Sequence, residues 1–164
     1  MNITYIIFAY LIGSIPTAYI YFKIKNKKDI RNYGSGNSGT LNIFRSYSFN
    51  AAAIVLLIDL IKSSCIAIIG KNIDISDSAF YFATIMAVIG HNFPFYLKFK
   101  GGKGVAVASG ITLITIPIPA ISAGITIAIL TLILKSPLWG IFIGAIVLNA
   151  LNIIINQSFI MFFA

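Results

Sequence analysis

Long apolar runs alternate with short polar segments along the chain, and most runs are long enough to cross a membrane. Apolar residues dominate about 3–22, 51–70, 79–97, 105–134 and 138–164. A helix that spans a bilayer needs about 20 consecutive apolar residues. The pattern therefore predicts an all-α, polytopic membrane helix bundle with five to six hydrophobic helical segments and short polar loops.

Two of these runs need further interpretation. The run over 105–134 contains Pro117 and Pro119, and proline removes a helix hydrogen bond. It is therefore either one kinked crossing or two short helices. The run over 3–22 has no basic start and no small-residue cleavage site before the lysines that follow it. We expect it to be a retained membrane helix and not a signal peptide.

Composition supports the membrane assignment. Of the 164 residues, 59% are hydrophobic and 10% are charged, whereas a soluble domain has about 25% charged residues. We expect a single integral membrane domain over 1–164. The formal net charge of +8 does not indicate nucleic-acid binding, because the basic residues lie beside the apolar runs. With Cys65 as the single cysteine, a disulfide within the chain is excluded, and no metal site is expected.

The distribution of lysine and arginine predicts the orientation. Nine of the twelve lie in 23–45 and 98–103, whereas Lys71 and Lys135 lie in the loops expected on the other side. Basic residues accumulate in cytoplasmic loops. We therefore expect a multi-pass protein of the plasma membrane with an extracytoplasmic N-terminus and both basic segments in the cytoplasm.

Both basic segments contain a glycine-rich motif. The first loop, 34–39, has the sequence Gly-Ser-Gly-Asn-Ser-Gly and is followed by Asn42 and Arg45; the second loop, 90–104, ends in Lys-Gly-Gly-Lys-Gly. Glycine lets the backbone approach a ligand closely. Backbone N–H groups together with lysine and arginine side chains bind phosphate. On one side of a membrane, the two loops predict a site where a phosphorylated, water-soluble substrate meets a lipid.

Each feature also has a structural interpretation. The structural interpretation of the segment 34–45 is a flexible linker, although the spacing of its polar residues favours a binding site. The second loop is otherwise a basic surface for anionic headgroups. His91, the only histidine, is either a structural residue at a helix end or part of the site. Asp59 and Lys62 share one helix face, either as a structural ion pair or as part of the site.

Taken together, the motifs resemble the PlsY family of acyl-phosphate:glycerol-3-phosphate acyltransferases. The resemblance covers about 10–110 and is carried by Gly13-Ser14-Ile15-Pro16, Asp29-Ile30-Arg31, Gly34-Ser35-Gly36-Asn37, Asn42, Arg45, Asp59-Leu60-Ile61-Lys62 and the run from Gly90 to Gly104. It implies transfer of a fatty acyl group from acyl phosphate to the 1-hydroxyl of glycerol 3-phosphate, which gives lysophosphatidic acid for phospholipid synthesis. Glycerol 3-phosphate, acyl phosphate and the lipid bilayer are the implied partners, and no cofactor, metal or coenzyme A is implied.

The resemblance also implies roles for single residues. Catalytic roles fall on Ser35, His91 and Lys103. The substrate phosphate is expected to bind Ser35, Gly36, Asn37, Asn42, Arg45, Gly101, Gly102, Lys103 and Gly104.

Two other functions stay open at this point. The polar motif that the family carries near its C-terminus has no counterpart in the apolar segment 159–164. The main alternative is therefore a non-catalytic paralogue that binds glycerol phosphate or lipid headgroups in a membrane complex. A small transporter is the third hypothesis, because transporters contain broken helices and intramembrane charges.

Overall fold

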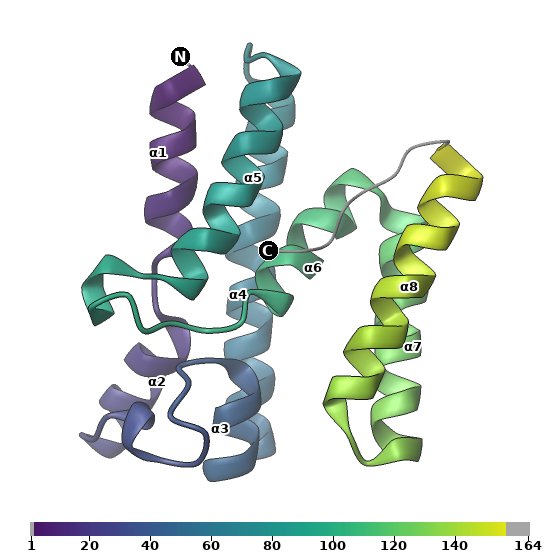
Figure 1. Cartoon of the computed structure of the whole chain (residues 1–164). Coiled ribbons are helices and arrows are strands. Elements are labelled where there is room, and N and C mark those ends of the chain that lie inside the picture. The colour runs from purple at the N-terminus through teal and green to yellow at the C-terminus, as the bar shows by residue number, and fades with distance from the viewer. Residues whose placement is uncertain (1, 157–164) are drawn as a thin grey trace. The chain divides into compact units, whose positions relative to one another are not determined.

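The computed structural model describes residues 2–156, and over these residues the chain is helical without strands (Figure 1). In chain order the elements are α1 (Asn2–Gly13), α2 (Thr17–Asn26), the 3-10 helix η1 (Ile30–Asn32), α3 (Thr40–Ser46), α4 (Phe49–Asn72), α5 (Asp77–Asn92), the 3-10 helix η2 (Phe95–Leu97), α6 (Val105–Thr115), α7 (Pro117–Leu134) and α8 (Pro137–Asn156). The predicted all-α class is confirmed.

Five segments of the described chain are long and apolar enough to cross a membrane. They are Asn2–Asn26, Phe49–Asn72, Asp77–Leu97, Pro117–Leu134 and Pro137–Ile155. The apolar helix α6 is shorter, so the five to six expected segments are found. The end of the last predicted run, 157–164, lies outside the described residues.

The first apolar run is two helices, where the sequence predicted one. Pro16 has no N–H and disfavours helical geometry in the residue before it. Helix α1 therefore ends at Gly13, and the N–H of Thr17 donates to the carbonyl of Ile15, at 3.0 Å, at the start of α2. At this break, the carbonyl oxygens of Gly13 and Ile15 can accept hydrogen bonds from a side chain of another helix.

The run over 105–134 is likewise two helices, which settles the alternative left by its prolines. Helix α6 ends at Thr115, and Ile116 is the N-cap of α7. Pro117 occupies the first turn of α7, where a missing N–H costs little. Serine caps begin α4 and α5, since Ser48 accepts from the N–H of Ala51 and Ser76 from that of Ala79.

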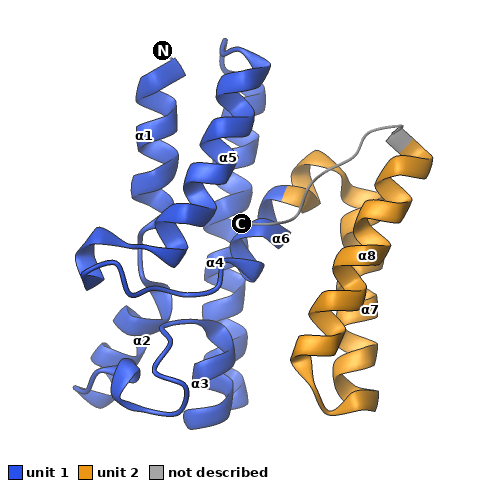
Figure 2. Ribbon diagram, in the orientation of Figure 1, with its two compact units in different colours: residues 1–111 blue, residues 112–164 orange. Residues whose placement is uncertain are grey.

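The chain divides into two compact units, 1–111 and 112–164 (Figure 2). In the first unit, α1 packs along α5 and α4, and α2 and α3 pack against α4. In the second unit, α7 and α8 form an antiparallel pair. That the two units form a single membrane domain stays a prediction.

Small residues let helices approach closely inside each unit. A Cβ at Gly13 of α1 would overlap the backbone of Ala87 in α5, and one at Gly144 of α8 would overlap the side chain of Ile127 in α7. In lipid, such close backbone contact is a main source of helix association. The first unit carries both glycine-rich loops, and the candidate site lies within it.

Candidate functional site

An open cleft of about 520 Å³ lies where the two glycine-rich loops meet. It is lined by the first loop, the end of α5 and the second loop, through Ser35, Gly36, Asn37, Asn92, Phe93, Phe99, Lys100, Gly101, Gly102 and Lys103. Segments about 65 residues apart in the sequence thus share one cavity. Six of the predicted site residues line it: Ser35, Gly36, Asn37, Gly101, Gly102 and Lys103.

The cleft offers polar side chains that have no protein partner. Among the described residues, the side chains of Ser35, Asn37, Lys100 and Lys103 make no hydrogen bond or ion pair. The chain contains four acidic residues, all of them described, and none lines the cleft. Two lysines without a neighbouring carboxylate make the cleft electropositive, which favours an anionic ligand.

The glycines of the second loop allow it to pack tightly on the end of α5. The N–H of Gly101 donates to the carbonyl of Asn92 at 3.0 Å, and that of Gly102 donates to the carbonyl of His91 at 2.9 Å. A Cβ at Gly101 would overlap the His91 carbonyl, and one at Gly102 would overlap His91 Nε2. These N–H groups are therefore engaged within the protein, unlike the free phosphate donors that the sequence predicted.

Asn42 braces the first loop and does not line the cleft. Its side chain is 2% exposed. Its Oδ1 accepts from the N–H of Ser35 at 2.9 Å, and its Nδ2 donates to the carbonyls of Tyr33 at 2.9 Å and Asn37 at 2.8 Å. These bonds fix the backbone of Ser35 and Asn37 at the edge of the cleft, and contact of Asn42 with the substrate phosphate stays a prediction.

Two further predicted phosphate ligands lie outside the lining residues. Arg45 is exposed on α3, and its side chain makes no hydrogen bond with a described residue. Gly104 has a φ of +75° just before α6, and a Cβ there would lie 2.8 Å from Asn92 Oδ1. Glycine is needed at this position for both reasons. Contact of either residue with substrate stays a prediction.

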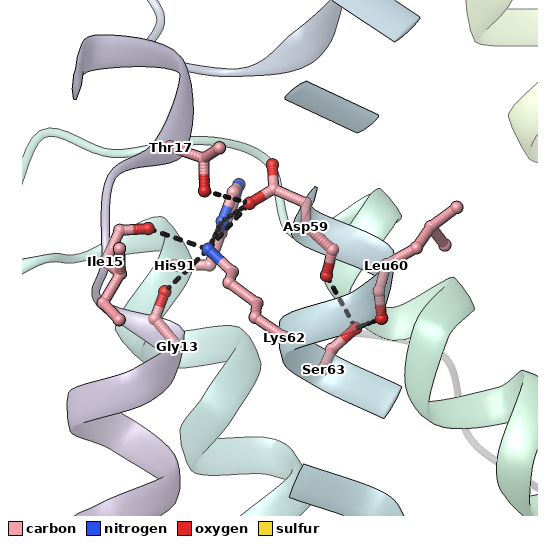
Figure 3. Close-up of polar contacts among 8 residues, drawn as sticks. All are labelled: Gly13, Ile15, Thr17, Asp59, Leu60, Lys62, Ser63 and His91. Atoms are coloured by element: carbon pink, nitrogen blue, oxygen red, sulfur yellow. Dashed lines mark hydrogen bonds and ion pairs between the residues drawn. The ribbon is translucent and has the colours of Figure 1, made fainter. Parts of the chain in front are cut away.

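Behind the second loop, a buried polar cluster surrounds Lys62 (Figure 3). Lys62 Nζ forms the expected ion pair with Asp59 Oδ1 at 2.7 Å, and the two side chains are 8% and 1% exposed. Lys62 Nζ also lies 3.3 Å from His91 Nδ1. His91 is thus a buried part of this cluster, although it does not line the cleft itself.

The break between α1 and α2 completes the cluster. Lys62 Nζ donates to the carbonyl of Ile15 at 2.8 Å and reaches that of Gly13 at 3.3 Å, while Thr17 Oγ1 donates to Asp59 Oδ1 at 2.8 Å. An intramembrane lysine is costly unless it is paired in this way. The sequence indicated the Asp59–Lys62 pair, but not Thr17 or the two carbonyls.

A second ion pair lies in the segment before the first loop, and its arginine also bonds the second loop. Arg31 Nη2 lies 2.7 Å from Asp29 Oδ2, and Arg31 Nη1 donates to the carbonyl of Leu97 at 3.1 Å. The Arg31 hydrogen bond to its carboxylate lowers the pKa of Asp29, and the same hydrogen bond raises the pKa of Arg31. The Asp-Ile-Arg motif was part of the resemblance, but no sequence signal pointed to Leu97.

Known proteins resemble the chain throughout. A family model described as "Glycerol-3-phosphate acyltransferase" matches residues 3–164, a longer stretch than the 10–110 expected from the motifs. The glycerol-3-phosphate acyltransferase of Thermoanaerobacter pseudethanolicus is 40% identical over 155 residues, which cover 93% of this chain and 76% of the relative. That of Endomicrobium trichonymphae is 46% identical over 111 residues, which cover 68% of this chain and 56% of the relative.

Solved structures give the same result. The crystal structure of PlsY (YgiH), an integral membrane glycerol 3-phosphate acyltransferase in its glycerol 3-phosphate form, matches with a TM-score of 0.86 at 30% identity, over 93% of this chain and 76% of that one. The lysophosphatidic acid form matches with a TM-score of 0.70 at 24% identity, over 99% and 95% of the two chains, and supports the fold.

Proposed function

The chain belongs to the glycerol-3-phosphate acyltransferase family, and we propose that it transfers a fatty acyl group from acyl phosphate to the 1-hydroxyl of glycerol 3-phosphate. The product is lysophosphatidic acid. The glycerol 3-phosphate form of the related PlsY structure supports this acceptor. The acyl phosphate donor rests on the sequence motifs. Membership of an acyltransferase family argues against the transporter.

The observation that carries the proposal is the electropositive cleft between the glycine-rich loops. Lys100 and Lys103 lack protein partners among the described residues, and Ser35 and Asn37 face the same space with unused polar groups. Charge-assisted hydrogen bonds from lysine are well suited to a phosphate dianion. We assign the phosphate of glycerol 3-phosphate to these four side chains.

The reaction needs positioning more than a protein nucleophile. Acyl phosphate is a mixed anhydride with a good leaving group. The acceptor oxygen attacks the acyl carbon, the bond from that carbon to the phosphate oxygen breaks, and the acceptor proton passes to a substrate phosphate oxygen. Orientation of the two substrates and stabilisation of the developing negative charge supply the rate enhancement.

Asn92 suits the acceptor hydroxyl. It lines the cleft, and its Oδ1 is buried without a hydrogen-bond partner among the described residues. An unpartnered buried acceptor is costly and takes a donor when one is offered. A glycerol hydroxyl is such a donor, whereas a phosphate oxygen is not. Asn92 would therefore orient the glycerol end of the substrate while the lysines hold its phosphate.

An acyl-transfer assay tests the proposal. The purified protein in detergent is given labelled glycerol 3-phosphate together with palmitoyl phosphate, and separately with palmitoyl coenzyme A. We expect labelled lysophosphatidic acid from the acyl phosphate alone. An equal amount of product from the coenzyme A ester would overturn the assignment of acyl phosphate as the acyl donor. Binding of glycerol 3-phosphate without product from either donor would favour the non-catalytic alternative.

A further inference from the structure

In the buried cluster behind the second loop, Lys62 Nζ lies close to three oxygen acceptors and one ring nitrogen of His91. Asp59 Oδ1 and the Ile15 carbonyl are the closest, at 2.7 Å and 2.8 Å from Nζ. The Gly13 carbonyl and His91 Nδ1 both lie at 3.3 Å. An ammonium group has three donor hydrogens and no acceptor. Two hydrogens take the closest acceptors, and the third lies between Gly13 and His91.

This geometry decides which nitrogen of His91 carries the proton. A proton on Nδ1 would point at a group that only donates. A neutral imidazole has one donor nitrogen and one acceptor nitrogen. We propose that Lys62 is a positioning residue that holds His91 in the tautomer protonated on Nε2.

The consequence falls on Gly102, which lines the cleft. His91 Nε2 occupies the space that a Cβ of Gly102 would need. The Nε2–H tautomer therefore directs a donor toward this part of the cleft wall, whereas the other tautomer would direct a lone pair toward it. A donor there favours an anionic ligand. This part of the inference rests on the proposed function, because it assigns a phosphate to the cleft.

The surrounding structure keeps Lys62 in place. Thr17 Oγ1 bonds the same carboxylate oxygen that Lys62 uses, and the helix break at Pro16 turns two carbonyls toward its ammonium group. Second-sphere partners of this kind fix the tautomer and orientation of a histidine. One arrangement thus involves the broken first helix, the Asp59–Lys62 pair and the single histidine. It holds the Lys62 ammonium group beside His91 Nδ1.

Because His91 is the only histidine, nitrogen NMR of protein labelled with ¹⁵N-histidine reports on one imidazole. In the wild-type chain we expect a protonated Nε2 and an unprotonated Nδ1. In Lys62→Met the ammonium group is gone, while the acceptor Asp59 Oδ1 remains 3.9 Å from Nδ1, and the proton should move to Nδ1. Lys62→Arg keeps a donor and should keep the wild-type spectrum. The control Ser63→Ala is on the same helix and removes only bonds to carbonyls of its own helix.

Turnover with acyl phosphate and glycerol 3-phosphate is measured on the same preparations. Lys62→Met should lower kcat on the order of 10–100-fold, the range known for the loss of a histidine's hydrogen-bond partner at metal sites, with a smaller change in KM. Ser63→Ala should change neither. A proton on Nδ1 in the wild-type protein overturns the proposal without any variant. An unchanged spectrum in folded Lys62→Met, or a changed one with full turnover, also overturns it. The spectra need no catalysis, so a failed acyl-transfer assay leaves the tautomer assignment tested independently.

Discussion

At the scale of single residues, Asn42 of α3 fixes the first loop through several side-chain hydrogen bonds. Replacing it by alanine leaves the Ser35 N–H and the carbonyls of Tyr33 and Asn37 without this partner. A fully buried group left unsatisfied costs about 1–3 kcal/mol, and these part-buried groups cost less. We expect Asn42→Ala to lower the melting temperature in detergent clearly and to weaken substrate binding. Ser46→Ala removes one bond to the same amide and should have a small effect. Equal melting curves for both variants would contradict this role.

Lys103 is the residue through which the cleft is most directly tested. Lys103→Ala should weaken glycerol 3-phosphate binding by about 1.5–3 kcal/mol, the worth of a charge-assisted hydrogen bond. The matched control is Lys25→Ala, which removes the same charge from the exposed end of α2, away from the cleft. Isothermal titration gives both affinities. A similar loss in the two variants would mean that general attraction, and not a specific contact, binds the substrate.

Asp29 gives the loops a dependence on pH. The hydrogen bond from Arg31 holds the pKa of Asp29 below its ordinary value. A lowered carboxyl pKa stabilises the fold fully above the unfolded pKa, about 4, and the contribution is lost as the pH falls through the folded value. Asp29→Asn should therefore lower the free energy of unfolding at pH 7 by about 1 kcal/mol or less. Below about pH 4, the variant should lose less stability than the wild-type protein, because it has no carboxylate to protonate at this position. Thermal unfolding at several pH values measures this. A wild-type and variant difference that grows toward low pH would refute it.

The sequence predicted which residues belong to the site region better than it predicted the interactions that each of them makes. Asn42 and the glycines were recognised as site residues because of their spacing. The partners that they have within the protein could not be predicted, because a polar side chain or N–H binds whichever partner the fold brings nearest. For Asn42 of α3 these are the carbonyls of Tyr33 and Asn37, and for Gly101 and Gly102 they are carbonyls at the end of α5. Sequence spacing contains no information about that competition.

At the scale of elements, the second loop depends on its close approach to α5. Gly102→Ala would place a methyl group in the space of the His91 imidazole, and overpacking of this kind costs about 1–3 kcal/mol. We expect a lower melting temperature and reduced turnover. Gly124→Ala is the control, because a Cβ there meets nothing within 4 Å in α7. It should stabilise the helix by about 0.5–1 kcal/mol. A stable, fully active Gly102→Ala would show that the loop has more room than its contacts indicate.

The helices themselves follow from the hydrophobic pattern, since placing about 20 apolar residues in lipid outweighs local preferences. The break before α2 was not predicted, because Ser14 and Pro16 interrupt an otherwise apolar run and membrane helices tolerate proline as a kink. Here the freed carbonyls find Lys62, 47 and 49 residues away along the chain. Such a long-range partner is visible only in the folded chain.

At the scale of the whole molecule, the contacts between distant segments agree with the orientation inferred from charge. Asn2 and Ser76 are hydrogen-bonded at 3.2 Å, so the start of α1 lies beside the start of α5. Arg31 donates a hydrogen bond to the Leu97 carbonyl, so the two basic segments meet each other, away from the starts of α1 and α5. The positive-inside rule then favours an extracytoplasmic start of α1 and a cytoplasmic cleft. This is the side on which a water-soluble phosphorylated substrate from metabolism would be available.

Cysteine labelling in intact cells tests this orientation. In a Cys65→Ser background, we introduce one cysteine at Asn32, exposed in η1, or at Asp74, exposed between α4 and α5. A membrane-impermeant maleimide should label the cysteine at 74 in intact cells, and the cysteine at 32 only after the membrane is opened. Both positions leave the cleft and the Lys62 cluster untouched, and activity measurements confirm that each variant folds. Labelling of both positions in intact cells would place the basic loops outside. The cleft would then face away from any cytoplasmic substrate, and the proposed reaction would lose its supply of glycerol 3-phosphate.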